Sequence, residues 1–238
     1  MPAAGAWLSS PFAATDNGRT ETTMHEGGTL AAFDLDGTLH WTEKALVPAI
    51  RRAMSEMGAE PAAAERINAL YGEPLEEFCR DLLGTGREND CRRFMLAIDR
   101  HQRDTLPATG ALYPGVRGML RELRKAGVSM AVISNAGEDY IRLVLKTFGI
   151  HDRFDALLGV DNGLSKTRRL RSLLQTGGYC AAVMVGDRYH DLQAAEENGV
   201  RFIGCAYGYG APGEMDRADE LVGAAAEIPS AMIRLGLI

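Results

Sequence analysis

The sequence predicts an α/β protein in which a parallel sheet is covered by helices on both faces and carries an inserted all-helical segment. From Gly115 onward, apolar strand-like runs alternate with helical patterns. Before Gly115, after one short apolar run, the pattern is helical throughout. The chain has 238 residues, 46% of them hydrophobic and 24% charged, which is typical of a globular protein with one large domain or two smaller ones.

The first predicted strand ends in two acidic residues. Leu30–Phe33 is a short apolar run, and Asp34, Leu35, Asp36 and Gly37 follow it. Side chains alternate along a strand, so Asp34 and Asp36 are expected on the same side. Two carboxylates this close raise each other's pKa, and a cation such as Mg²⁺, which prefers hard oxygen ligands, relieves that repulsion. A single pair of this kind is more often two solvated aspartates in a turn. A metal site at this position therefore needs support from motifs elsewhere in the chain.

The N-terminal half divides into a tail and a helical segment. Residues 1–28 are rich in small and polar residues and are predicted to be a disordered tail without a signal peptide, and Met24 is an alternative start. Apolar spacing then predicts helices at residues 45–57, 61–70, 73–83 and 91–101. Residues 107–115 are expected to return the chain to the sheet. We therefore predict a helical domain at residues 43–113 and a core domain made of residues 29–42 and 114–238.

Strands and helices alternate in the remaining chain. Helices are predicted at residues 116–126, 137–148, 166–175, 188–198 and 224–235. Strands are predicted at residues 128–133, 154–160, 180–185 and 200–205. Glycines such as Gly127 and Gly199 follow the helices, as is common at helix C-termini. Connections between parallel strands are expected to be right-handed.

Polar residues follow several predicted strands. Ligands of open α/β sheets bind beyond the carboxyl ends of the strands. Ser134 and Asn135 follow one strand, while Asp187 and Asp191 lie one helical turn apart after another. Each pair alone is also explained as a helix cap. Lys166 begins a helix, where the helix dipole disfavours a cation, so it is expected to neutralise a phosphate or a carboxylate.

Four segments resemble the motifs of the haloacid dehalogenase-like hydrolase superfamily. In chain order they are Phe33–Leu39, Val132–Asn135, Ser165–Lys166 and Val185–Asp191. Two further segments resemble its phosphoglycolate phosphatase-like branch, namely Leu112–Val116 and Tyr207–Gly210. Thr167 departs from the pattern, because many relatives have proline there. The resemblance covers residues 30–221 and implies a Rossmann-like three-layer core with a parallel sheet plus a small α-helical cap domain.

The resemblance also implies a Mg²⁺-dependent phosphatase that hydrolyses phosphate monoesters of small metabolites through an aspartyl-phosphate. Asp34 is the implied nucleophile, and Asp36 the implied proton donor and acceptor. Mg²⁺ would be held by Asp34, the backbone carbonyl of Asp36 and Asp187, with Asp191 in a supporting position. The phosphoryl oxygens would be bound by Ser134, the backbone of Asn135, and Lys166.

Several alternatives fit the same motifs. Phosphoglycolate, a nucleoside monophosphate and a sugar phosphate are all suitable substrates, and a sugar phosphomutase would use the same first step. A dehalogenase is disfavoured because Asp36 is present. A phosphonatase would need a Schiff-base lysine, for which the helical segment offers only Lys44. A non-catalytic module that binds phosphorylated metabolites is more distant, because all four motif acids are present.

Three residues are candidates for selecting the substrate. His40 and Trp41 closely follow the first motif and can line the mouth between the two domains, although Trp41 is equally suited to packing in a hinge. Arg93 belongs to an arginine-rich helix and can pair with a second anionic group of the substrate, although a solvated helix face explains these arginines more simply.

The net charge and the cysteine spacing limit the kinds of partner and the compartment that we expect for this protein. The net charge of -6 argues against a nucleic-acid partner, and the apolar runs are too short for a membrane span. The four cysteines have neither zinc-binding nor redox-motif spacing, which indicates reduced thiols in a cytoplasmic protein.

Overall fold

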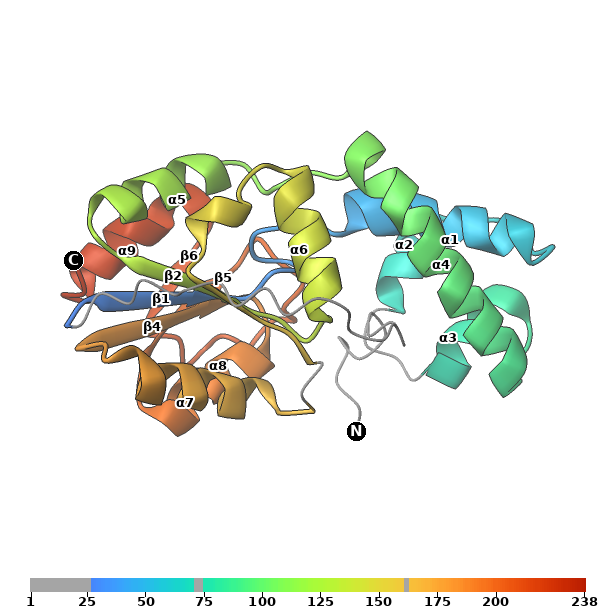
Figure 1. The fold of residues 1–238 in the computed structure, drawn as a ribbon. Helices are drawn as coiled ribbons and strands as arrows, with labels where there is room; N and C mark the ends of the chain where they lie inside the picture. The colour runs from blue at the N-terminus through green and yellow to red at the C-terminus, as the bar shows by residue number, and fades with distance from the viewer. Residues whose placement is uncertain (1–26, 71–74, 161–162) are drawn as a thin grey trace.

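The computed structural model describes residues 27–70, 75–160 and 163–238 (Figure 1). Of the predicted disordered tail, all but its last two residues lie outside the described part. Six strands form one sheet in the order β3-β2-β1-β4-β5-β6, and each of its five strand pairs is parallel. The predicted α/β class with a Rossmann-like parallel sheet is confirmed.

The order of the strands places β1 in the interior of the sheet. Leu30 of β1 aligns with Ser129 of β2 on one side and with Ala182 of β4 on the other. The residues that follow β1 and β4 therefore leave the sheet side by side. The strands are β1 (Thr29–Phe33), β2 (Ser129–Ile133), β3 (Ala156–Leu158), β4 (Ala181–Gly186), β5 (Arg201–Cys205) and β6 (Glu220–Val222).

Helices cover both faces of the sheet (Figure 1). One layer contains α5 (Val116–Lys125), α6 (Glu138–Thr147) and α9 (Ile228–Arg234), and the other contains α7 (Lys166–Gly177) and α8 (Tyr189–Asn198). Because strand side chains alternate, β1 belongs to both cores. Ala31 and Phe33 pack in the cluster of the first layer, whereas Leu30 and Ala32 pack in that of the second.

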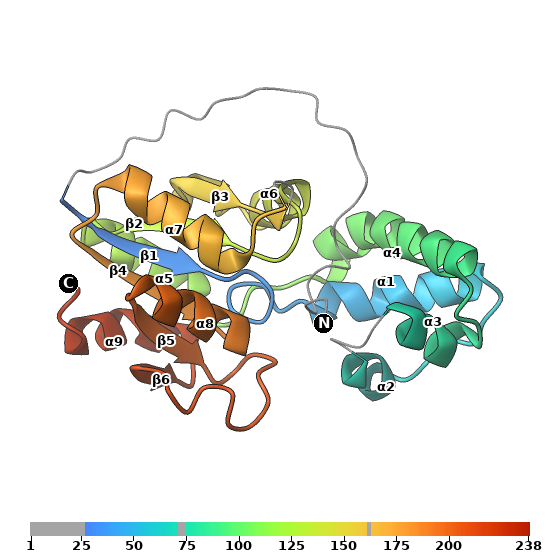
Figure 2. The same cartoon turned by 90° about the horizontal axis from the view of Figure 1, so that it is seen from below.

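Four helices lie beyond the carboxyl ends of the strands (Figures 1 and 2). They are α1 (Glu43–Glu56), α2 (Ala64–Ala69), α3 (Leu75–Leu83) and α4 (Glu88–Thr109). Their apolar faces form a cluster of their own, which includes Ile50, Met54, Phe78 and Phe94. We refer to α1–α4 as the helical segment.

Several predicted element boundaries differ from the structure. Helix α4 continues through Pro107 to Thr109, where a return loop was predicted. Proline removes one backbone hydrogen bond from the helix at its own position, and only two residues of α4 follow it. Helix α2 begins at Ala64 rather than at Pro61. Strand β6 was not predicted, because three residues are too few to reveal a period.

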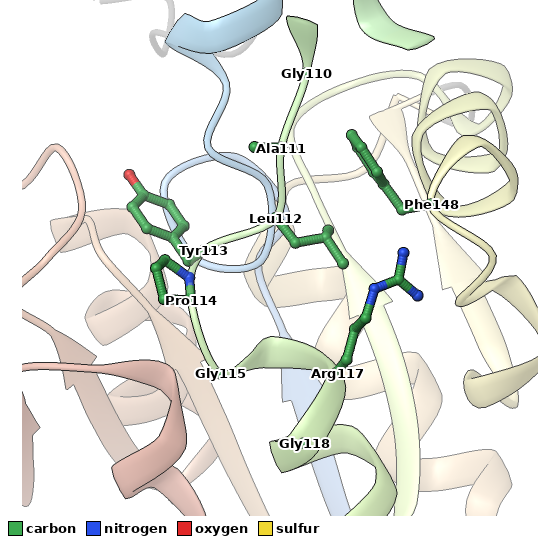
Figure 3. A pocket seen from close by; sticks show the side chains of 9 residues that line it. All are labelled: Gly110, Ala111, Leu112, Tyr113, Pro114, Gly115, Arg117, Gly118 and Phe148. Carbon is green, nitrogen blue, oxygen red and sulfur yellow. The ribbon is translucent and has the colours of Figure 1, made fainter. Parts of the chain in front are cut away.

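Two short linkers connect the helical segment to the sheet. Trp41 N donates to Ala111 O at 2.9 Å, and Tyr113 N donates to Leu39 O at 3.0 Å. The Trp41 and Tyr113 rings stack with centroids 5.4 Å apart. A cavity of about 430 Å³ lies against the second linker, and its lining includes Leu112, Tyr113 and Phe148 (Figure 3). Within the described ranges, no helix is long and apolar enough to cross a membrane.

The cluster of the helical segment should depend on Phe94. Phe94 is fully buried, whereas Leu96 on the same helix is 45% exposed. We expect Phe94→Ala to lower the free energy of unfolding by about 3–5 kcal/mol, because truncation leaves a cavity. Leu96→Ala, the control, should change it by about 0.5 kcal/mol. Urea denaturation followed by circular dichroism measures both, and equal losses would contradict the assigned core.

Candidate active site

Three aspartates meet at the carboxyl ends of β1 and β4. Asp34 follows β1, Asp187 follows β4, and Asp191 lies in the first turn of α8. Each offers a carboxylate oxygen, and these three oxygens lie within 4.8 Å of one another. All three residues are buried, with Asp34 only 6% exposed. Like charges at this density are unfavourable unless cations compensate them.

Lys166 supplies part of that compensation. It occupies the first position of α7, and its Nζ donates to Asp34 Oδ1 and to Asp191 Oδ1, each at 2.6 Å. Burial disfavours its charged form, but Asp191 and Asp34 outweigh this effect and raise the pKa of Lys166 above its ordinary value. The cation at the positive end of the helix dipole is therefore stabilised by the two ion pairs.

The protonation of the aspartates reflects the same crowding. Burial raises the pKa of Asp34 well above its ordinary value; Lys166 opposes the change, while Asp191 and Asp187 add to it. Burial, followed by repulsion from Asp191, raises the pKa of Asp187 to about 7. A divalent cation would favour the ionised form of both groups, because it offsets this repulsion.

Three glycines let two chain segments approach Asp187 closely. A Cβ on Gly37, whose φ is +84°, would lie 2.1 Å from Asp187 Oδ2. A Cβ on Gly208 would lie 2.3 Å from the Asp187 Cβ, and one on Gly210 would lie 2.3 Å from its carbonyl oxygen. Between these two glycines, Tyr209 N donates to Asp187 Oδ2 at 2.7 Å. The Asp187 carboxylate is thus held by the turn after β1 and the loop after β5.

Asp191 is fixed from two directions. Its Oδ2 accepts a hydrogen bond from Arg188 N at 3.1 Å, which caps the N-terminus of α8, while Oδ1 accepts from Lys166. A Cβ on Gly186 would lie 2.3 Å from the Asp191 Cγ, so only glycine fits there. Asp191 offers a carboxylate oxygen to the same group as Asp34 and Asp187, and its supporting position stays a prediction.

The Asp36 side chain lies apart from this cluster. Its Oδ1 accepts hydrogen bonds from Thr42 Oγ1 at 2.7 Å and Tyr140 OH at 3.1 Å, and lies 3.1 Å from His40 Nδ1. The sequence predicted that Asp34 and Asp36 share a side, but β1 ends at Phe33 and the turn that follows breaks the alternation. The carboxylate of Asp36 is not in the metal-binding group of aspartates, so its predicted metal contact can come only from its backbone carbonyl.

The partners of Asp36 come from separate elements, and sequence analysis missed Thr42 and Tyr140. Tyr140 belongs to α6, and its OH accepts a hydrogen bond from Gln102 Nε2 of α4 at 3.2 Å. Gln102 is only 2% exposed. A hydrogen-bonded chain therefore runs from the helical segment through α6 to Asp36. Nothing in the spacing of these residues marks them, because the chain depends on the packing of α4 against α6.

The predicted phosphate-binding loop follows β2. Ser134 is buried, and its Oγ accepts from Ala136 N at 3.1 Å; Asn135 is half-buried beside it. Sequence analysis also missed Arg169, whose guanidinium donates to the backbone carbonyl of Ser134 and, at 3.0 Å, to Asn135 Oδ1. Its one-turn spacing from Lys166 on α7 was the available signal, but three arginines within four residues obscured it.

The three candidates for substrate selection occupy different surroundings. His40 is fully buried between Asp36 and the ring of Phe148, whose centroid lies 5.7 Å from its own. Trp41 stacks on Tyr113 in the linkers, and Lys44 lies 4.3 Å above its ring. Arg93 is exposed on α4, 16 residues before its end at Thr109, which is about 24 Å along a helix. Their role in specificity stays a prediction.

A family model describes most of the chain. Residues 31–205 match the model of haloacid dehalogenase-like hydrolases. The chain belongs to this family. The expectation of an enzyme of this superfamily, of the phosphatase type, is confirmed. Carboxylate oxygens are the ligands that Mg²⁺ prefers, and the group of Asp34, Asp187 and Asp191 fits the cation that enzymes of this superfamily generally use.

Relatives with curated names cover much of the chain. It is 33% identical over 195 residues to phosphoglycolate phosphatase from Pseudomonas putida, covering 76% of this chain and 70% of that one. It is 29% identical to tyrosine-protein kinase PtkA from Mycobacterium tuberculosis, covering 83% and 68%. It is 28% identical to a 5'-nucleotidase from Pseudomonas aeruginosa, covering 77% and 85%. The resemblance to the phosphoglycolate phosphatase-like branch is confirmed.

The fold is shared with solved structures. The structure of a predicted phosphoglycolate phosphatase from Haemophilus somnus superposes with a TM-score of 0.76 at 24% identity, covering 86% of this chain and 98% of that one. This similarity supports the fold of this family member.

The close approach of Gly37 to Asp187 can be tested by comparison with a glycine where an added Cβ would have no close neighbours. Gly127 has a similar φ of +78°, but a Cβ there would meet nothing within 4 Å. Gly127→Ala should lower the free energy of unfolding by about 1–2 kcal/mol, the cost of a left-handed alanine. Gly37→Ala should lower it further, because Asp187 must also move. Denaturation curves measure both, and a smaller loss for Gly37→Ala would contradict the packing around Asp187.

Proposed function

We propose that this protein is a Mg²⁺-dependent phosphatase of small phosphorylated metabolites, similar to phosphoglycolate phosphatases, that works through an aspartyl-phosphate. The observation that carries the proposal is the position of Asp34. Its carboxylate follows a central strand, pairs with Lys166 at 2.6 Å and adjoins Asp187. A carboxylate held by one cation in a group of acids is suited to attack phosphorus once the incoming phosphate charge is neutralised.

In the first half-reaction, Asp34 forms a bond to phosphorus and the bond to the leaving oxygen breaks. Lys166 keeps Asp34 in one orientation and offsets charge on the phosphoryl oxygens, together with Ser134 and the backbone N–H of Asn135. Asp36 gives its proton to the leaving oxygen. The three polar partners at Asp36 Oδ1 orient this group for that transfer.

In the second half-reaction, water replaces Asp34 on phosphorus. Asp36, now ionised, takes a proton from the water, and inorganic phosphate leaves with Asp34 regenerated. Mg²⁺, held by Asp34, the Asp36 carbonyl and Asp187, would offset negative charge on the phosphoryl group. Asp191 would act through Lys166, which it holds in place.

The helical segment is proposed to act as a cap. We assign residues 43–113 to it and residues 29–42 and 114–238 to the core. The linkers pair with each other, and the Gln102–Tyr140–Asp36 hydrogen bonds join the two parts. A cap in this position would limit the access of water and select small substrates. A cytoplasmic location and a small phosphorylated metabolite as partner belong to the same proposal.

A second candidate is phosphoryl transfer to a protein hydroxyl. The similarity to the tyrosine-protein kinase PtkA favours it. In that case the phosphoryl group on Asp34 would pass to a tyrosine oxygen instead of to water. The two candidates differ in the acceptor and share the dependence on Asp34.

Substitution of Asp34 tests both candidates. We expect Asp34→Asn to reduce kcat by at least about 10⁴-fold, because an amide is not a nucleophile at phosphorus. The exposed Asp152→Asn is the control and should keep full activity. Phosphate release is measured by a colorimetric assay. Retained turnover in the Asp34 variant would contradict its role.

Removal of the metal tests whether activity depends on Mg²⁺. EDTA should abolish activity and excess Mg²⁺ should restore it, because buried carboxylates require a counter-charge. Asp187→Asn should raise the Mg²⁺ concentration needed for half-maximal activity by about tenfold or more, as loss of one ligand does. Activity is followed during a Mg²⁺ titration. Full activity in EDTA would exclude this metal site.

A substrate panel separates the remaining possibilities. Phosphoglycolate, nucleoside monophosphates, sugar phosphates and phosphonoacetaldehyde are offered with Mg²⁺, and ATP is offered with a tyrosine-containing peptide. We expect one small phosphate monoester to exceed the others in kcat/KM, because the cap excludes larger compounds. Phosphopeptide formation detected by mass spectrometry, without phosphate release from the esters, would favour the second candidate.

A further inference from the structure

Arg169 is a buried cation that lies outside the four motif segments. It is 1% exposed and is among the largest fully buried side chains of the described residues. A guanidinium group is rarely buried so completely unless it holds specific acceptors. It sits one turn after Lys166 on α7, so the same helix sends both cations toward the carboxyl edge of the sheet.

The guanidinium of Arg169 joins the ends of two strands. Its Nη1 donates to the backbone carbonyls of Ser134 and Leu158, the latter at 2.9 Å. Its Nη2 donates to Asn135 Oδ1 at 3.0 Å. Leu158 O also accepts from Ser134 N at 3.1 Å. The planar fork of an arginine can hold such divergent acceptors at once, whereas a lysine cannot.

These contacts fix the orientation of one peptide bond. In a trans peptide the C=O and N–H groups point in opposite directions, and the described residues contain no cis peptide bond. Because Arg169 holds the carbonyl of Ser134, the N–H of Asn135 must point away from Arg169. Among the described residues no acceptor receives that N–H. The loop after β2 thus presents this donor at the carboxyl edge of the sheet, next to the end of β1 that Asp34 follows.

We propose that Arg169 is a positioning residue that aims the N–H of Asn135 at a phosphoryl oxygen of the substrate. The inference rests on the proposed function, since it concerns the same phosphate site. Arg169 does not contact the phosphate. It acts through the Ser134–Asn135 peptide, and it holds the Asn135 side chain so that the loop cannot rotate.

Binding of inorganic phosphate, the expected product, tests this role without turnover. Calorimetric titrations with Mg²⁺ present compare the full-length protein with Arg169→Met, Arg169→Lys and Arg168→Met. Arg168 is exposed on the same helix and serves as the matched control. We expect Arg169→Met to weaken phosphate binding about tenfold, because a misdirected donor loses its hydrogen bond. Arg169→Lys should recover part of the affinity, and Arg168→Met should match the wild type.

Three further measurements distinguish a positioning role of Arg169 from a general effect on stability. In Arg169→Met, Mg²⁺ affinity should stay within about twofold of the wild type, because the metal ligands belong to other segments. For the best substrate of the panel, kcat should fall about 100-fold, as for loss of one oxyanion donor. Guanidinium ions should partly restore phosphate binding to Arg169→Ala, and urea at the same concentration should not. If Arg169→Met does not fold, the phosphate affinity of Arg169→Lys and the guanidinium experiment test the positioning role of Arg169.

Wild-type phosphate affinity in Arg169→Met, or equal losses of phosphate and Mg²⁺ affinity, would overturn the inference. Failure of the proposed function looks different. In that case the wild type releases no phosphate from any substrate, yet phosphate binding still depends on Arg169.

Discussion

The two ion pairs of Lys166 are the interaction on which the rest of the site depends. Asp34, Asp187 and Asp191 are buried within a few ångströms of one another, and burial raises the pKa of Asp34 and of Asp187. Lys166 pairs with two of them at 2.6 Å and is itself charged because of them. Three carboxylates and one ammonium group leave an excess of negative charge, which explains why a divalent cation suits the remaining space. A phosphate monoester can approach such a site only when that excess is compensated.

The sheet explains why these groups meet at all. β1 lies between β2 and β4, so the turn after β1 adjoins the residues that follow both neighbours. Asp34, Asp187 and the Ser134–Asn135 loop all extend beyond the same edge. Glycines then remove the side chains that would keep backbone segments apart, and the turn at Gly37 reaches the Asp187 carboxylate directly. The order of the parallel strands brings the candidate catalytic residues to one edge of the sheet. The glycines at positions 37, 208 and 210 then allow the backbone to pack closely against Asp187.

Asp36 belongs to a second network that faces the helical segment. Its carboxylate is oriented by Thr42 and His40 near the first linker and by Tyr140 of α6, which in turn is bonded to Gln102 of α4. The three side chains that contact the Asp36 carboxylate belong to the core, as does Lys166, which contacts Asp34. Gln102 connects this second network to the helical segment through Tyr140.

The sequence by itself determined the alternation of strands and helices, the helical segment, and the acids at the ends of β1 and β4, because periodicity and motif spacing are local properties. Family membership followed from the same short motifs. Only the tertiary structure decided which groups touch. Strand β6 and the end of α4 were missed because their signals are weak or cancelled by a proline, and the separate partners of the Asp36 carboxylate were missed because Asp36 lies in the turn after β1, where strand alternation no longer applies. Tyr140, Gln102 and Arg169 act through contacts between segments distant in the chain, and no local pattern encodes such contacts.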